Sequence, residues 1–150
     1  MTEAVLVRRI AARPAIVFDA LVTADGIASW WGPEEQPALS AVADARVNGR
    51  FRVSFRTSDG CENECTGEFL EIVKPTHVVL SWRWAVGGEP DERENVSKVE
   101  FRLRAIDTGT ELTLIHSALV SEASARGHTF GWDGSLKKLQ RRYSGPNPTA

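Results

Sequence analysis

The sequence contains no long hydrophobic run. Apolar residues make up 42% of its 150 residues, yet nowhere do they approach the roughly 18 in succession that a transmembrane helix needs. Positions 1–10 alternate in polarity and include Arg8 and Arg9, where a secretory signal peptide requires an apolar stretch. We therefore expect a cytoplasmic protein with no membrane span.

Cysteine is also scarce. If Cys61 and Cys65 share one strand, their Cα atoms lie roughly 13 Å apart, whereas a disulfide needs less than about 7 Å. They can pair only if a turn separates them, and no second pair of cysteines exists to complete a zinc site. The sequence predicts two separate, reduced thiols, as is usual in the cytoplasm, with no metal and no cofactor.

An excess of charge of either sign is missing, because 18 Lys and Arg residues oppose 20 Asp and Glu residues and leave a formal net charge of -2. A nucleic-acid-binding domain normally carries a basic stripe, so no nucleic-acid partner is expected. We interpret the one basic cluster as the solvated face and last turns of a C-terminal helix, where cations complement the helix dipole. It consists of Lys137, Lys138, Arg141 and Arg142.

Common catalytic motifs are absent as well. The sequence has no Gly-x-Ser-x-Gly elbow, no phosphate-binding glycine loop and no His-Glu-x-x-His zinc motif. Gly127, Gly131 and Gly134 fall within a predicted helix, whereas a dinucleotide-binding fingerprint follows a strand. No catalytic residue is assigned, and we expect a binding protein in preference to an enzyme.

What the sequence does contain is one series of secondary-structure signals with no linker and no repeat. A strand is expected over 3–11, followed by a short helix that begins at Pro14 and a second over 25–31 that ends at Gly32-Pro33. Alternating apolar and polar side chains then predict six strands, over 38–46, 51–56, 62–73, 78–84, 99–105 and 112–116.

The last predicted element is a long helix over 121–143, which begins at Ser121. Each interior glycine costs about 1 kcal/mol relative to alanine, so its three glycines predict either close approach to the sheet or a break near Gly127. The whole pattern predicts a single α+β domain, with an ordered core over 3–143 and a disordered tail over 144–150. Apolar residues recur in the helix at roughly helical spacing, at Phe130, Trp132, Leu136 and Leu139.

Four segments, in this order, resemble a known family. They are 10–21, Trp30-Trp31-Gly32-Pro33, 67–72 with Pro75 and Leu80-Ser81-Trp82, and 131–139. Over about residues 3–143 the chain is similar to the START-like (SRPBCC) superfamily and resembles most its Hsp90-ATPase-activator-homology branch. The resemblance implies a helix-grip fold, in which a curved antiparallel sheet of about six or seven strands wraps a long C-terminal helix, with two short helices.

The resemblance also implies a cavity between the curved sheet and the final helix. Members of the superfamily include lipid carriers, hormone receptors and aromatase/cyclases, so the fold does not imply one activity. The activators of the Hsp90 ATPase that give the branch its name carry a separate N-terminal domain that engages the chaperone. No segment of this sequence corresponds to that domain.

Large aromatic residues are the main candidates for the cavity wall. Of Trp30 and Trp31, whose directions differ by about 100° on a helix, one is expected in the core and one at the pocket mouth. These rings either pack the core or line an apolar pocket. The aromatic residues assigned to a ligand are Phe18, Trp31, Phe51, Phe55, Trp82, Trp84, Phe101 and Trp132.

Two histidines complete the predicted ligand site. His116 follows Leu112 and Leu114 on an inward strand face, and His128 lies four residues before Trp132 on the same helix face. The two imidazoles are therefore expected to face each other across the cavity. They are either satisfied core residues, donors that orient a polar head group, or a catalytic base, and a metal pair lacks a third ligand.

Other polar residues receive weaker assignments. His77 is expected to be exposed, and Asp133 to lie on the surface or pair with an arginine. Glu68 is expected to point outward unless a bulge at Gly67 turns it into the interior, where it could act as an acid or base.

The expected function is therefore non-enzymatic binding or carriage of a hydrophobic small molecule or a lipid-like ligand. One alternative is a stress- or chaperone-associated protein with a protein partner. The other is an enzyme of the aromatase/cyclase or dehydratase kind, in which His116, His128 or Glu68 moves protons. A monomer or a homodimer is expected, because exposed sheet edges permit pairing.

Overall fold

The computed structural model describes residues 2–33 and 36–144, which form one sheet and three α-helices. The predicted tail lies outside the described residues from position 145 onward. The elements are β1 (Thr2–Ile10), α1 (Pro14–Val22), α2 (Ala24–Trp30), β2 (Ser40–Ala43), β3 (Arg50–Arg56), β4 (Glu62–Val73), β5 (His77–Val86), the 3₁₀ helix η1 (Pro90–Glu92), β6 (Ser97–Ile106), β7 (Gly109–Leu119) and α3 (Glu122–Ser144).

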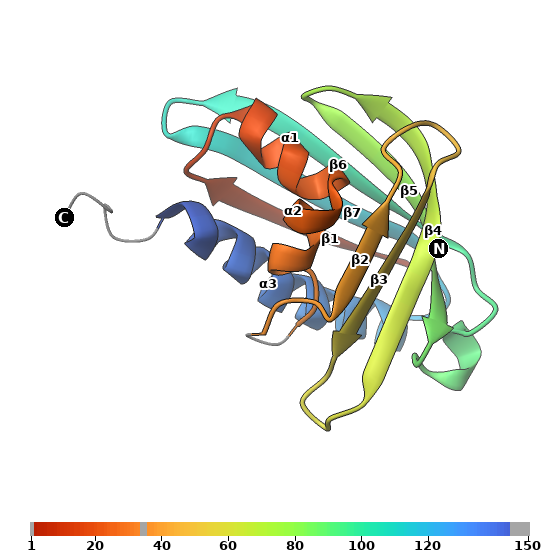
Figure 1. Cartoon of the computed structure of the whole chain (residues 1–150). Helices are drawn as coiled ribbons and strands as arrows, with labels where there is room; N and C mark the ends of the chain where they lie inside the picture. The colour runs from red at the N-terminus through yellow and green to blue at the C-terminus, as the bar shows by residue number, and fades with distance from the viewer. Residues whose placement is uncertain (1, 34–35, 145–150) are drawn as a thin grey trace.

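The sheet is antiparallel throughout and has the order β1-β7-β6-β5-β4-β3-β2. Figure 1 shows it curving around α3, with α1 and α2 in the connection between the edge strands β1 and β2. Seven strands, two short helices and one long C-terminal helix confirm the predicted helix-grip fold. The predicted strand over 38–46 is shorter, since β2 covers only Ser40–Ala43.

Helix α3 begins with a local cap and continues without interruption. The backbone N–H of Ser124 donates to Oγ of Ser121 at 3.0 Å, which satisfies one of the free donors of the first turn, as predicted. The helix then runs for 23 residues through Gly127, so of the two alternatives the break near Gly127 is wrong. Its buried side packs against the sheet through Trp132, Leu136 and Leu139.

Two side chains of α3 differ in burial from what helical spacing and charge predict. Phe130 shares the spacing of the buried apolar residues, yet it is 75% exposed. Lys138 was assigned to the solvated face and is buried instead, with Nζ donating to the carbonyl oxygens of Trp31 at 3.4 Å and Gln36 at 2.7 Å. These bonds tie α3 to the segment that follows α2, which residue spacing on one helix cannot reveal.

Trp30 joins three elements in the core. Its side chain is fully buried, and its indole N–H donates to the carbonyl of Ala20 in α1 at 2.8 Å. The ring packs edge-on against Phe101 of β6 at 6.1 Å and lies 6.2 Å from Trp132 of α3. Because the indole is both packed and hydrogen-bonded, it belongs to the core, as one member of the Trp30–Trp31 pair was predicted to do.

Strand β4 corrects the interpretation of Gly67. The register irregularities of β4 fall on either side of this residue, so the alternative of a bulge at Gly67 is wrong. Glycine is needed there for close approach, because a Cβ atom would lie 1.9 Å from the carbonyl oxygen of Ser81. The side chain of Glu68 is 41% exposed and reaches toward Arg50 at 3.9 Å, which is the outward orientation.

Two hydrogen bonds of His77 and one ion pair of Asp133 hold these polar residues on the outside of the sheet and on α3. His77 was expected to be exposed, but its side chain is only 24% exposed and lies between Glu71 at 3.1 Å and Glu100 at 2.6 Å. That expectation is therefore wrong. Asp133 pairs with Arg8 of β1 at 2.9 Å, which confirms the predicted arginine partner.

The two cysteines are free and lie in different environments. Cys61 is exposed and Cys65 is buried, which confirms separate thiols. Burial raises the pKa of the Cys65 thiol well above its usual value, so this residue behaves as a small apolar side chain.

The glycines of α3 give the first testable prediction. A Cβ atom at Gly134 would lie 2.4 Å from the carbonyl oxygen of Pro33, so Gly134→Ala should lower the free energy of unfolding by about 1–3 kcal/mol. A Cβ atom at Gly127 would lie in open space, so Gly127→Ala should raise the free energy of unfolding by up to about 1 kcal/mol through helix propensity. Urea unfolding measures both, and effects of the same sign would contradict the packing described here.

Candidate ligand-binding cleft

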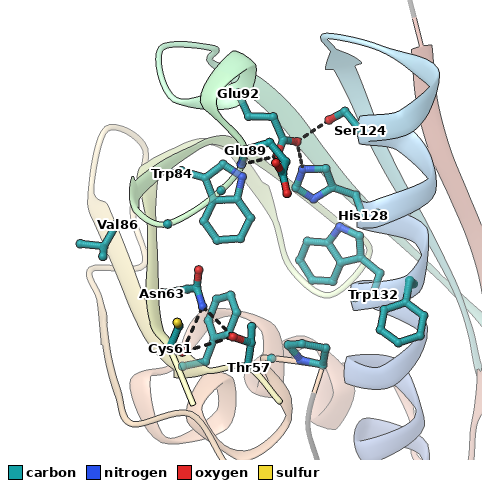
Figure 2. Close-up of a pocket in the computed structure, with 18 of the residues that line it drawn as sticks. Thr57, Cys61, Asn63, Trp84, Val86, Glu89, Glu92, Ser124, His128 and Trp132 are labelled. Carbon is teal, nitrogen blue, oxygen red and sulfur yellow. Dashed lines mark hydrogen bonds and ion pairs between the residues drawn. The ribbon is translucent and has the colours of Figure 1, made fainter. Parts of the chain in front are cut away.

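A cleft of about 1020 Å³ lies between the sheet and the N-terminal half of α3. Its walls come from β3, β4 and β5, from the loop that contains η1, and from α3 (Figure 2). Small-molecule sites usually measure roughly 300–1,000 Å³, so this cleft is large enough for a drug-sized ligand. It lies where the family resemblance implied a cavity.

Aromatic rings form much of the cleft wall, from both the sheet and the helix. Trp82 and Trp84 of β5 pack edge to face, with 4.7 Å between ring centroids. Trp31 and Trp132 make a similar contact at 5.0 Å on the other side. The aromatic residues that line the cleft are Trp31, Phe55, Trp82, Trp84, Phe130 and Trp132.

The sequence-based site separates into two groups. Trp31 belongs to the first group and is 3% exposed, so it is a buried part of the cleft wall. Six predicted residues line the cleft, namely Trp31, Phe55, Trp82, Trp84, His128 and Trp132. The others are buried and lie outside its lining, namely Phe18, Phe51, Phe101 and His116.

His116 is held by hydrogen bonds on both ring nitrogens. The indole N–H of Trp132 donates to Nδ1 at 3.0 Å, so Nδ1 must be an acceptor and the hydrogen lies on Nε2. Nε2 then donates to Oγ of Ser97 at 2.7 Å, and Ser97 donates to the carbonyl of Trp82 at 3.1 Å. This network fixes one neutral tautomer of His116.

The protonation state of His116 agrees with this geometry. Burial lowers its pKa well below the usual value, and the neighbouring His128, 4.4 Å away between ring centroids, lowers the pKa further. A second ring proton on Nδ1 would also face the Trp132 N–H. His116 is therefore a satisfied core residue in this structure, and the two histidines touch each other with no cavity between them.

Glu92 is the residue of the cleft that sequence analysis missed. Its carboxylate is 8% exposed, and Oε2 accepts a short hydrogen bond from Ser124 and another from Nε2 of His128 at 3.0 Å (Figure 2). The backbone N–H of Glu89 donates to Oε1 at 3.2 Å. The available signal was Glu89-Pro90-Asp91-Glu92, which has the proline and the three-residue spacing of a capping box.

The Glu92–His128 pair carries a net negative charge at neutral pH. Burial raises the pKa of Glu92, but hydrogen bonds from Ser124, from the Glu89 amide and from His128 outweigh it and leave that pKa below its usual value. Burial lowers the pKa of His128, and the adjacent carboxylate only partly offsets this. Glu92 is thus ionised and His128 neutral, with its hydrogen on Nε2 and a lone pair on Nδ1.

Two glycines of α3 keep part of the cleft open. No atom lies within 4 Å of a Cβ built at Gly127 or at Gly131, and both residues line the cleft. The predicted approach of these two glycines to the sheet is therefore wrong. Of the three glycines in α3, only Gly134 makes a close contact, and its neighbour is Pro33.

Two negative findings concern the part of the chain that the structure describes. Over 2–33 and 36–144, no three or more His, Cys, Asp or Glu residues gather in a way that could hold a metal ion. Within the same ranges, each helix is too short or too polar to cross a membrane.

An antiparallel sheet wrapped around a C-terminal helix, with a cleft between the two, defines a helix-grip protein. Within that class, the family described as "Activator of Hsp90 ATPase homolog 1-like protein" matches residues 11–143. The chain belongs to this family, as the sequence motifs indicated.

Solved structures from several bacteria share the fold. A protein from Chromobacterium violaceum has a TM-score of 0.80 at 22% identity, over 98% of this chain and 100% of its own. The AHSA1 protein from Silicibacter pomeroyi has a TM-score of 0.79 at 24% identity, over 94% and 96%. A Mycobacterium smegmatis protein reaches 0.79 at 18%, over 97% and 92%. These identities show the fold alone, and no curated protein matches the sequence.

The two buried histidines predict a pH dependence of stability. Both have a folded-state pKa below the ordinary 6.5, so below pH 6.5 the unfolded chain binds more protons than the folded one. The free energy of unfolding should therefore fall as the pH drops from 6.5, by up to about 1.4 kcal/mol per pH unit for each histidine.

Urea unfolding between pH 7.5 and 5.5 checks this dependence. The double variant His116→Asn/His128→Gln should flatten the slope near pH 6.5. It should also be less stable than the parent at pH 7.5 by about 1–3 kcal/mol, because the shorter amide cannot replace the hydrogen bond that Nε2 of His116 makes to Ser97. An unchanged slope in the double variant would show that other groups cause the pH dependence.

Proposed function

We propose that this protein is a non-enzymatic binding or carrier protein that holds a hydrophobic small molecule in the cleft between β3–β5 and α3. The observation that supports this most is the cleft itself, about 1020 Å³ in volume and walled by aromatic rings from two sides. Membership of a START-like family is consistent with such a role. The proposal places this function in the cytoplasm, where the exposed thiol of Cys61 would stay reduced.

The cleft has an apolar wall that can contact the body of a ligand and a polar end that can orient it. Ligand surface removed from water against the tryptophans would contribute about 25 cal/mol per Å². Glu92 and His128 lie together at one end of the cleft and offer a carboxylate and a ring nitrogen to a polar group of the ligand. A molecule with an apolar body and one polar end therefore matches the arrangement.

The same polar pair favours a second candidate function, proton transfer on a bound molecule. His128 has its hydrogen-bond partner Glu92 on Nε2, which leaves Nδ1 as the basic nitrogen. This would be an enzyme of the aromatase/cyclase or dehydratase kind. Conversion of a co-purified molecule during incubation, seen by mass spectrometry and lost in His128→Gln, would assign this activity.

The family's name also favours a chaperone-associated role, which is a third candidate. Native mass spectrometry of protein purified from its own host distinguishes the candidates. A small molecule released on denaturation would support the carrier function, whereas a bound protein would favour the partner role. A mass equal to that of the chain alone would count against tight binding of a carried ligand.

Filling the cleft tests the proposed function directly. Gly131→Leu places an isobutyl group in open space, so binding of the neutral apolar probe N-phenyl-1-naphthylamine should weaken at least about tenfold. Thr129→Leu adds comparable bulk to an exposed position of α3 outside the cleft and should leave the affinity unchanged. Fluorescence titration measures both, and equal affinities would place the probe elsewhere.

A further inference from the structure

The charged residues of the cleft are all acidic, and its histidine, His128, is neutral. Five acidic residues line it, and among the described lining residues there is no lysine or arginine. The chain as a whole has nearly balanced charge, with 18 Lys and Arg against 20 Asp and Glu, so composition does not explain the bias. The acidic lining residues are Asp59, Glu62, Glu89, Asp91 and Glu92.

The acidic residues occupy two levels. Asp59, Glu62, Glu89 and Asp91 are exposed, whereas Glu92 is buried in the wall. An acidic rim attracts cations from solution and repels anions, with a strength that falls as salt is added.

Glu92 has hydrogen bonds but no cationic partner among the described residues. Its donors are the hydroxyl of Ser124, the amide of Glu89 and the neutral imidazole of His128. Each donor is uncharged, so the buried negative charge is solvated by dipoles and not neutralised by an opposite charge. In a partly buried site, a cation close to such a carboxylate is attracted much more strongly than in bulk water.

Trp84 supplies an independent observation that points to a ligand. Its side chain lines the cleft, yet its buried Nε1 has no hydrogen-bond partner within the described residues. The neighbouring Trp82 is 5% exposed, and its indole N–H lies near the thiol of the buried Cys65. An indole N–H is only a donor, and buried donors are normally satisfied, so that of Trp84 matches a ligand with an oxygen acceptor.

The same indoles favour positive charge through their faces. Trp84 stacks on His128 with an interplanar angle of 27° and a centroid distance of 6.0 Å, next to the carboxylate of Glu92. Tryptophan is the best side chain for cation–π attraction, and a neighbouring carboxylate strengthens the binding of an ammonium group. Aromatic faces, acidic charge and an unsatisfied donor thus meet in one place.

From these observations we infer that the cleft binds a hydrophobic organic amine, a cation with an apolar or aromatic body and at least one oxygen acceptor. The inference rests on the proposed function and specifies the ligand of that site. The ammonium group lies near Glu92, the body against the tryptophans of β5, and the oxygen toward the indole N–H of Trp84. Anionic amphiphiles such as fatty acids are disfavoured by the same charges.

Three naphthalene compounds of matched size test this inference. They are 2-(1-naphthyloxy)ethylamine, 2-(1-naphthyloxy)ethanol and (1-naphthyloxy)acetate, which are cationic, neutral and anionic at neutral pH and share an ether oxygen as acceptor. Titration followed by the indole N–H resonances of uniformly ¹⁵N-labelled protein gives each affinity. The amine should bind at least about tenfold tighter than the acetate, the alcohol should lie between them, and added salt should reduce the difference.

Variants show whether the cleft causes the preference. Glu92→Gln keeps the size of the buried side chain and should reduce the preference for the amine several-fold. The triple variant Asp59→Asn/Glu62→Gln/Asp91→Asn changes only exposed rim positions, so it tests the charge even if Glu92→Gln fails to fold. Glu3→Gln removes the same charge from β1, outside the cleft, and should change nothing.

The possible outcomes distinguish failure of this inference from failure of the proposed carrier function. If the acetate or the alcohol binds as tightly as the amine, or if the preference survives in both cleft variants, the inference is wrong while the carrier function stands. If none of the three compounds binds and N-phenyl-1-naphthylamine also fails to bind, the proposed function itself fails. If calcium chloride at matched ionic strength shifts the same resonances and blocks the amine, the site takes an inorganic cation, which also overturns the inference.

Discussion

The structure depends on a series of hydrogen bonds that crosses the core from α3 to the sheet. Trp132 donates to His116, His116 donates to Ser97, and Ser97 donates to the carbonyl of Trp82. The series passes from α3 through β7 and β6 to β5, so it holds the helix at a fixed place on the concave face. It exists only while the imidazole is neutral, and burial maintains that state.

The cleft lies beside this network, but different residues form the network and the polar part of the cleft. His116 is fully buried by the fold, whereas His128, one ring away, lines the cleft and contacts Glu92. The polar pair of the cleft is assembled from α3 and from the 3₁₀ helix between β5 and β6. The loop therefore contributes the buried charge, while the sheet and α3 contribute the apolar surface and the rigidity.

Sequence patterns predicted the burial of residues that follow a strand or helix period and missed residues whose burial depends on a loop or a distant segment. Alternation placed Trp82 and Trp84 on the inward face of β5, and motif order predicted the helix-grip fold. Glu92 could not be found this way, because its burial comes from a loop folding onto α3 and not from its place in a repeat. Lys138 was misplaced for the same reason, since its partners are carbonyls of a distant segment. Charge alone does not show where a lysine points.

The open glycines of α3 have a consequence for how this site can change. Gly127 and Gly131 are one helical turn apart and both border the cleft without supporting the core. Each weakens the helix by about 1 kcal/mol relative to alanine, so the space beside them is maintained at the expense of stability. A single substitution at either position can thus reshape the cleft and stabilise the helix at once. The shape of the cleft is adjustable one methyl group at a time, on a scaffold whose packing need not be redesigned.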